Sequence, residues 1–144
     1  MDRREYILGI LRLAKDFNVE VTATRFQKTV FLVQEELGRD LGYKFIPYYF
    51  GPFSKELQDD VYRLEKQGFV NVEGTAIEDL VTGALVGFKK VYKITDKAPV
   101  VELDEELKNF VTEKLKMPLH DLLRYVYVKY PEYTATSLIK DKIF

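Results

Sequence analysis

Basic side chains are concentrated in two segments where a DNA-binding protein would use them. Residues 54–67 have the apolar spacing of an amphipathic helix, and residues 86–95 are rich in strand-forming side chains. Lysine and arginine on a helix face or a strand can neutralise DNA phosphates and position a protein on the duplex. The candidate nucleic-acid-binding residues are Lys55, Arg63, Lys66, Lys89, Lys90 and Lys93.

Acidic neighbours give the same charges a structural explanation. Within residues 54–67, four acidic side chains outnumber three basic ones. Lys55 with Asp59, and Asp59 with Arg63, have the i,i+4 spacing of helix-surface ion pairs, each of which stabilises a helix by about 0.2 to 0.5 kcal/mol. Lysines along a strand also protect an exposed edge from pairing with another chain. The net charge is −1, from 22 basic and 23 acidic residues, so DNA binding would depend on a local patch.

A second candidate site is the aromatic segment of residues 43–53, which holds six aromatic side chains in eleven positions. Aromatic side chains supply contact area at little cost in conformational entropy, so such a cluster suits a protein partner. Packing in the core is the alternative, and we expect it for Phe45, Phe50 and Phe53. For Tyr48 and Tyr49 both interpretations stay open, because a phenol hydroxyl needs a hydrogen-bond partner or water.

Catalytic chemistry has little support in the composition. The chain has no cysteine and one histidine, which excludes cysteine nucleophiles, cysteine zinc sites and multi-histidine metal centres. His120 precedes Asp121, and sequence neighbours point to different sides of a helix, so the two do not make a catalytic pair. The sequence has no GxxxxGK[ST] or GxGxxG motif for nucleotide phosphates. We therefore predict a non-enzyme without a catalytic residue, metal ion or cofactor, with an unfamiliar carboxylate site as the enzymatic alternative.

Length and composition predict one compact domain. The chain has 144 residues, of which 47% are apolar and 14% aromatic, enough to bury a core. No apolar run approaches the roughly 20 residues that cross a bilayer. Charged residues also occupy the start of the chain, MDRREY, where a signal peptide would be apolar. We expect no membrane partner and a cytoplasmic location.

Two helices are predicted to come first. Asp2 and Glu5 can form a capping box, and apolar residues follow at helical spacing, so the first helix should span residues 3–17. Thr24 and Gln27 offer a second capping box for the next helix.

The third helix and the hairpin after it have the layout of a winged-helix domain. Residues 54–67 follow a Gly-Pro break and end before Gly68, which suits the left-handed position at a helix C-terminus. Two β-rich segments, residues 69–73 and 86–95, should pair as the wing, with a long tip between them. Pro47 limits the aromatic segment to an edge strand or an irregular extended segment.

More helices are expected after a connector near Pro99. Asp104 should cap a fourth helix, Pro118 should start a fifth, and a short final helix should follow Pro131 and run through Ile143. A symmetric homodimer would use the apolar face of the fifth helix. That face consists of Leu122, Val126 and Tyr130.

Two short motifs carry a resemblance to a known family. Residues 26–31 read FQKTVF, and residues 48–57 read YYFGPFSKEL. A QK-containing helix followed by a Y-x-Y/F-G-P segment that leads into a helix resembles the YwgA-like proteins and, more distantly, the Panacea or SocA-type antitoxin domains. The resemblance is strongest over residues 1–73. The chain departs from the antitoxin pattern in having KTVF where those proteins usually have KLLY.

The resemblance implies a small, mostly helical, winged-helix-like module without known catalytic residues. Its better-described relatives neutralise toxins or act as adaptors for proteolysis. The motif singles out Gln27, Lys28, Tyr48, Gly51, Pro52 and Ser54. Lys28 and Tyr48 would be polar tips close to the turn that Gly51 and Pro52 form, so Lys28 joins Tyr48 and Tyr49 as a predicted partner-binding residue.

These predictions combine into one fold and two functions. The fold class is mainly α with a small β-hairpin (α+β), with a winged-helix-like core over residues 1–97 and a C-terminal helical extension over residues 98–144 packed on the same domain. The first functional hypothesis is a non-enzymatic regulator of transcription that binds DNA. The alternative is a protein-binding adaptor or antitoxin that acts through the aromatic segment and the third helix.

Overall fold

The structure is a computed structural model that describes residues 1–78, 81 and 85–134. The first and third helices begin where the sequence predicts them, and a side chain caps each of them. Helix α1 (Arg3–Asp16) starts with the predicted capping box, in which Asp2 and Glu5 each accept a backbone hydrogen bond. Helix α3 (Lys55–Lys66) starts at Ser54, whose hydroxyl accepts a hydrogen bond from a backbone N–H one turn later.

Helix α2 (Ala23–Glu35) begins at a different cap from the predicted one. The Thr22 hydroxyl, and not that of Thr24, accepts the hydrogen bond from Arg25 N at 3.1 Å. The short strand β1 (Val21–Thr22) explains the difference, because its pairing holds Thr22 in the extended conformation that a cap residue needs. Gln27, the other half of the predicted box, bonds to a different element of the fold.

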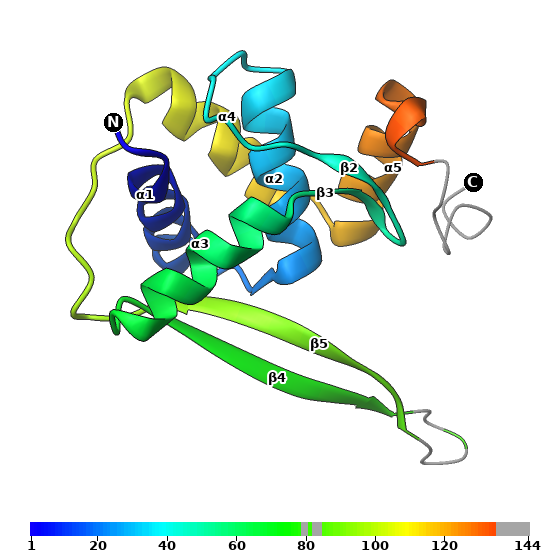
Figure 1. Cartoon of the computed structure of the whole chain (residues 1–144), viewed down its shortest axis with the longest axis horizontal. Coiled ribbons are helices and arrows are strands. Elements are labelled where there is room, and N and C mark those ends of the chain that lie inside the picture. The colour runs from blue at the N-terminus through cyan, green and yellow to red at the C-terminus, as the bar shows by residue number, and fades with distance from the viewer. Residues whose placement is uncertain (79–80, 82–84, 135–144) are drawn as a thin grey trace.

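The predicted wing is a hairpin of β4 (Val70–Glu78) and β5 (Leu85–Ile94). The strands are antiparallel, and β1 adds to the other edge of β5, giving the order β1-β5-β4. The prediction of a long tip is wrong, because pairing continues through Gly74 and Ala76 as far as Glu78. Threonine and isoleucine within this stretch favour extended backbone, which allows the longer ladder. Figure 1 shows the far half of the hairpin projecting beyond the helices.

The aromatic segment forms a second, smaller hairpin of β2 (Ile46–Tyr48) and β3 (Gly51–Phe53). Pro47 lies opposite Pro52, and neither has an N–H group, so the ladder stays short. Gly51 has a φ of +96°, and a Cβ there would lie 2.9 Å from Cε1 of Tyr127. Glycine therefore satisfies both a left-handed backbone and a close approach.

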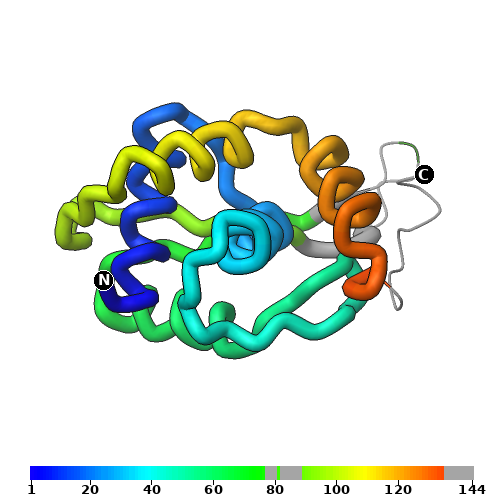
Figure 2. The backbone as a smooth tube through the Cα atoms, turned by 90° about the horizontal axis from the view of Figure 1, so that it is seen from above, coloured from blue at the N-terminus to red at the C-terminus, as the bar shows by residue number. Residues whose placement is uncertain are grey.

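Helix α2 lies at the centre of the fold. Figure 2 shows α1, α3, the β2–β3 segment, α4 (Glu105–Lys116) and α5 (Leu119–Lys129) arranged around it. Every residue from 25 to 33 is buried, including arginine, glutamine, lysine and threonine. The sequence predicts one apolar face for this helix, whereas the C-terminal helices cover the opposite side as well. Its polar side chains must consequently find partners inside the protein.

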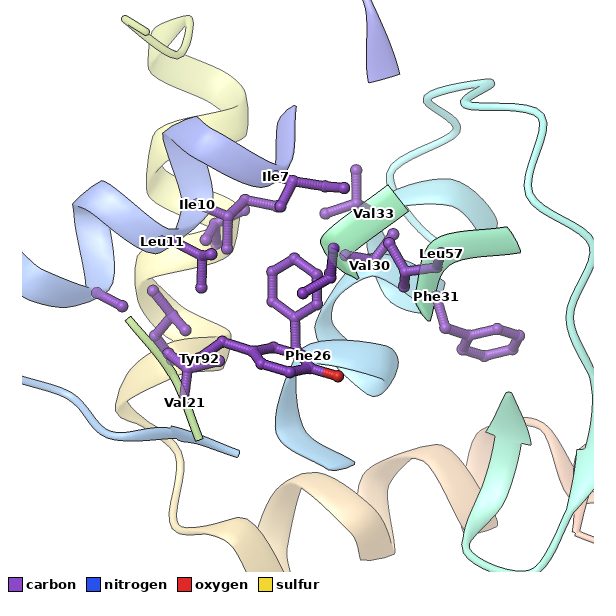
Figure 3. Packing of buried hydrophobic residues seen from close by; sticks show 14 of the residues in the cluster. Ile7, Ile10, Leu11, Val21, Phe26, Val30, Phe31, Val33, Leu57 and Tyr92 are labelled. Atoms are coloured by element: carbon purple, nitrogen blue, oxygen red, sulfur yellow. The ribbon is translucent and has the colours of Figure 1, made fainter. Parts of the chain in front are cut away.

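Most of the buried apolar side chains form one cluster that spans the N-terminal and C-terminal helices. Figure 3 shows Ile7, Phe26, Val30 and Leu57 converging between α1, α2 and α3, with Tyr92 from β5 closing the lower side. The rings of Phe26 and Tyr92 meet edge to face with 5.7 Å between centroids. The structure confirms the predicted fold class, a mainly helical α+β protein with a small antiparallel sheet.

The C-terminal helices contradict the predicted dimer face. Leu122 and Val126 on α5 are fully buried in the core, so they cannot form an interface with a second copy. Tyr130 packs edge to face on Phe31 at 5.1 Å. The 3-10 turn η1 (Pro131–Tyr133) follows, and the rest of the predicted final helix lies outside the described residues. None of the helices in the described part combines the length and apolar character needed to cross a bilayer.

Candidate functional site

The β2–β3 hairpin exposes four neighbouring large apolar side chains. The exposed fractions are 46% for Ile46, 42% for Tyr48, 49% for Tyr49 and 45% for Phe50. The ring of Tyr48 stacks on that of Tyr49 at 4.5 Å between centroids and on that of Phe53 at 5.0 Å. We call Ile46, Tyr48, Tyr49 and Phe50 the aromatic patch. Isolated exposed apolar residues are common on protein surfaces, but a contiguous group is not.

The core prediction for the aromatic segment is correct for Phe45, correct in part for Phe53 and wrong for Phe50. Phe45 is buried and Phe53 is half-buried. Phe50 was expected in the core but is exposed, because it occupies the turn between β2 and β3. Tyr48 and Tyr49, for which the sequence leaves both interpretations open, are on the surface.

Two polar residues of the buried helix α2 hold the end of this hairpin. The Gln27 side chain accepts a hydrogen bond from Ser54 N at 2.9 Å and donates one to Ser54 O at 3.0 Å. Lys28 Nζ donates to the carbonyl oxygen of Pro52 at 3.2 Å. The start of α3 and the last residues of β3 are thus fixed to the centre of the fold, which orients the aromatic patch.

Lys28 cannot be a direct contact to a partner, contrary to the prediction. Only 2% of its surface is exposed. Burial lowers the pKa of its ammonium group from the ordinary 10.5 to about 7, because surroundings of low polarity disfavour the charged form. No carboxylate in the described part of the chain forms an ion pair with it, and its hydrogen-bond partner is a neutral carbonyl.

A cavity of about 160 Å³ lies between α2 and the hairpin. The first turn of α2 contributes Ala23 and Thr24, and Gln27 and Lys28 follow one turn later. Gln58 of α3 also reaches the wall. The remaining walls are mainly aromatic and include Tyr48, Phe50, Phe53 and Tyr92. The cavity and the aromatic patch therefore share two side chains, those of Tyr48 and Phe50.

The basic residues predicted to bind DNA lie on α3 and β5, but acidic side chains neutralise half of them. Lys89 pairs with Glu20 at 3.0 Å and Lys93 with Glu73 at 3.1 Å. Arg63 pairs with Asp60 at 2.8 Å. Lys90 donates a hydrogen bond to the hydroxyl of Tyr62. Lys55 and Lys66 are exposed.

The predicted i,i+4 ion pairs on α3 are wrong. Arg63 bonds to Asp60, three residues earlier, and in the described part of the chain Lys55 has no ion pair with Asp59. Asp60 is the stronger partner because it is nearly fully buried and also receives Arg3 Nε at 2.8 Å. A buried carboxylate needs such partners, whereas half-buried Asp59 keeps contact with solvent and needs them less.

Asp60 is a structural centre that the sequence reasoning missed. Its carboxylate accepts a hydrogen bond from the Tyr43 hydroxyl at 2.7 Å in addition to the two arginine contacts. Burial and the Asp60 charge raise the pKa of the Tyr43 phenol well above its ordinary value. The sequence spacing does indicate a buried position for Asp60, because it falls between Leu57 and Leu64 on the apolar stripe of α3.

The described residues contain no group of three or more histidine, aspartate or glutamate side chains able to hold a metal ion. His120 and Asp121 are both exposed. Neither the protein-family models nor the curated proteins contain a match to this chain. The resemblance to the YwgA-like proteins therefore stays a prediction.

Proposed function

We propose that this chain is a non-enzymatic adaptor that binds another protein through the aromatic patch. The supporting observation is that four neighbouring apolar side chains, Ile46, Tyr48, Tyr49 and Phe50, are each more than 40% exposed on one short hairpin. Together they present roughly 300 Å² of apolar surface, the size of the largest apolar patch on a typical monomeric protein, and such patches are often functional. Covering that area would contribute about 7 kcal/mol before the costs of association are subtracted.

The area of the patch favours a partner that extends onto neighbouring surface. A standard protein–protein interface buries about 800 Å² on each partner, well above what this patch alone offers. The exposed side of α3 carries both signs of charge, with Lys55 and Lys66 among the bases and Glu65 among the acids. An apolar centre with a mixed-charge rim is the usual composition of a protein–protein interface. The partner expected here presents an apolar segment flanked by residues of both charges.

A winged-helix-like frame is consistent with this proposal. Apart from the β2–β3 hairpin, which is inserted between α2 and α3, the elements up to β5 follow the order α1, β1, α2, α3, β4, β5, and the three-stranded sheet has the order β1-β5-β4. The resemblance to antitoxin and adaptor domains points to the same kind of non-enzymatic module. In such a module the frame holds the aromatic patch at the entrance to α3, through Gln27 and Lys28.

Affinity capture with matched variants tests the adaptor function. The patch variant carries Tyr49→Ser and Phe50→Ser, and the control carries Val128→Ser, which removes an exposed apolar side chain from α5. A partner bound by the wild type and the control but lost with the patch variant is then purified, and its affinity is measured by calorimetry. We expect the patch variant to weaken binding by about 30-fold or more, as for central interface aromatics. If no captured protein depends on the patch, the proposal is wrong.

DNA binding is the second candidate function. Arg63, Lys66 and Lys90 line one concave surface between α3 and β5, although Asp59 and Glu65 share it. Fluorescence anisotropy with a short duplex at two salt concentrations tests this candidate, because phosphate contacts make the affinity fall as salt rises. Binding that weakens with salt and is lost on Lys66→Gln and Lys90→Gln would support it. An absence of salt-dependent binding at low ionic strength would exclude it.

A further inference from the structure

Lys28 is a buried cation whose hydrogen-bonding capacity is largely unused. An ammonium group has three N–H donors. One of them bonds to Pro52 O, and the described part of the chain provides no second hydrogen bond and no carboxylate. Removing a charge from water without a counter-charge costs several kcal/mol. The side chain is therefore suited to an anion that comes from outside the protein.

The cavity beside Lys28 has the size and walls for one flat ring. Its volume of about 160 Å³ is close to that of an engineered apolar cavity that binds benzene, about 150 Å³. Tyr48, Phe50, Phe53 and Tyr92 make most of the wall aromatic. Aromatic walls favour a planar apolar body, which can stack on them or meet their edges.

The first turn of α2 adds to the attraction for an anion. Ala23 and Thr24, the first two residues of this helix, line the cavity. The N-terminal end of a helix carries a partial positive charge from its free N–H groups. Among the described residues, the titratable side chains that face Lys28 and the cavity are the phenols of Tyr48 and Tyr92, which line it, and that of Tyr127, which lies close to Gly51. None of the described residues that line the cavity is acidic, so none of them would repel the ligand.

From this geometry we propose that the cavity binds a small carboxylate on a flat apolar body, with the carboxylate on Lys28 and the ring between the aromatic walls. The cation supplies affinity for the charge, and the volume limits the body to about one ring. A bound carboxylate also keeps Lys28 protonated. This proposal does not rest on the docking function proposed for the aromatic patch, although the two sites share Tyr48 and Phe50.

Titration of the wild-type protein with benzoate and benzamide tests the proposal without a variant. The two probes have nearly the same shape, and only benzoate is charged. In two-dimensional ¹⁵N NMR spectra, benzoate should shift the amide signals of Ala23, Thr24 and Gly51 and bind about tenfold more tightly than benzamide. Equal affinities, no binding of either probe, or shifts confined to other surfaces such as that of Val128 would each overturn it.

A charge-deleting variant adds a second measurement. Lys28→Met keeps an unbranched side chain of similar length and should lower the affinity for benzoate about tenfold or more while leaving that for benzamide nearly unchanged. Lys66→Met, which removes an exposed lysine of α3, serves as the control and should bind benzoate as the wild type does. Benzoate affinity that survives Lys28→Met in a folded protein would refute the role of Lys28.

Discussion

Lys28→Met should stabilise the protein at neutral pH, and the gain should shrink as the pH rises. The wild-type side chain is almost fully buried, and its single hydrogen bond goes to Pro52 O. Methionine fills a similar volume without a charge, and such replacements of poorly compensated buried charges are often stabilising. The perturbation therefore isolates the cost of the buried ammonium group.

The magnitude follows from the pKa of Lys28 in the two states. The folded value of about 7 lies below the ordinary 10.5 that the unfolded chain retains. Between these values the unfolded state holds a proton that the folded state has released, so the wild-type free energy of unfolding rises by about 1.4 kcal/mol per pH unit. Across the whole window the change is about 5 kcal/mol. Below about pH 7 both states are protonated, and the full penalty of the buried charge is present.

Urea unfolding followed by circular dichroism, from about pH 6 to about pH 10, measures this effect. The difference in unfolding free energy between Lys28→Met and the wild type should be largest below pH 7 and fall steadily above it. Taking the difference cancels the pH dependence that comes from groups present in both proteins, including the phenols of Tyr43 and Tyr92. Lys66→Met, on the surface, should show no such slope. A Lys28→Met difference that stays constant over the whole range would refute the reasoning.

Three further substitutions test buried contacts around the β2–β3 hairpin and α3. Gln27→Ala removes the side chain that bonds to the buried N–H and C=O of Ser54. It should lower the free energy of unfolding, measured by urea denaturation, by about 2 to 4 kcal/mol, and a loss below about 0.5 kcal/mol would contradict this. Gly51→Ala places a Cβ 2.9 Å from Tyr127 at a position with a left-handed backbone. It should lower the Tm measured by calorimetry by about 5 °C or more, whereas an unchanged Tm would show that the hairpin adjusts freely. Asp60→Ala removes the acceptor of two arginines and a tyrosine hydroxyl. It should lower the free energy of unfolding by about 3 to 5 kcal/mol in the same urea assay, and a near-neutral effect would contradict this by showing that water replaces the carboxylate.

Features governed by neighbouring residues were predictable from the sequence. Asp2 and Asp104 cap helices α1 and α4 as predicted, because a cap needs only a side-chain oxygen close to the first free N–H groups. Gly68 has a φ of +83° and Phe69 N bonds to Leu64 O, as expected of a glycine that ends a helix. These interactions are local, so their spacing in the sequence identifies them.

Features governed by distant segments were not predictable in the same way. Leu122 and Val126 have the spacing of an exposed apolar face, but that face packs against the rest of the chain. Lys28 was expected near the surface, but helices on both sides of α2 enclose it. Lys89 pairs with Glu20 because β1 and β5 are neighbours in the sheet. Each of these outcomes depends on residues far away in the sequence, which periodicity does not report.

The cost of burying Lys28 bears on why the chain has a lysine there. Hydrogen bonding of Pro52 O alone does not require a charge, since a neutral donor such as a glutamine amide could supply it. A buried cation that lowers stability at neutral pH by several kcal/mol is a poor choice for packing, and perturbed lysines of this kind concentrate at sites of binding or chemistry. The same side chain also anchors the hairpin whose Tyr48 and Phe50 belong to both the cavity and the aromatic patch. A carboxylate on Lys28 would therefore act on two of the aromatic side chains that we propose for partner binding. Adding benzoate should change the affinity of the wild-type protein for its identified partner, but not that of Lys28→Met.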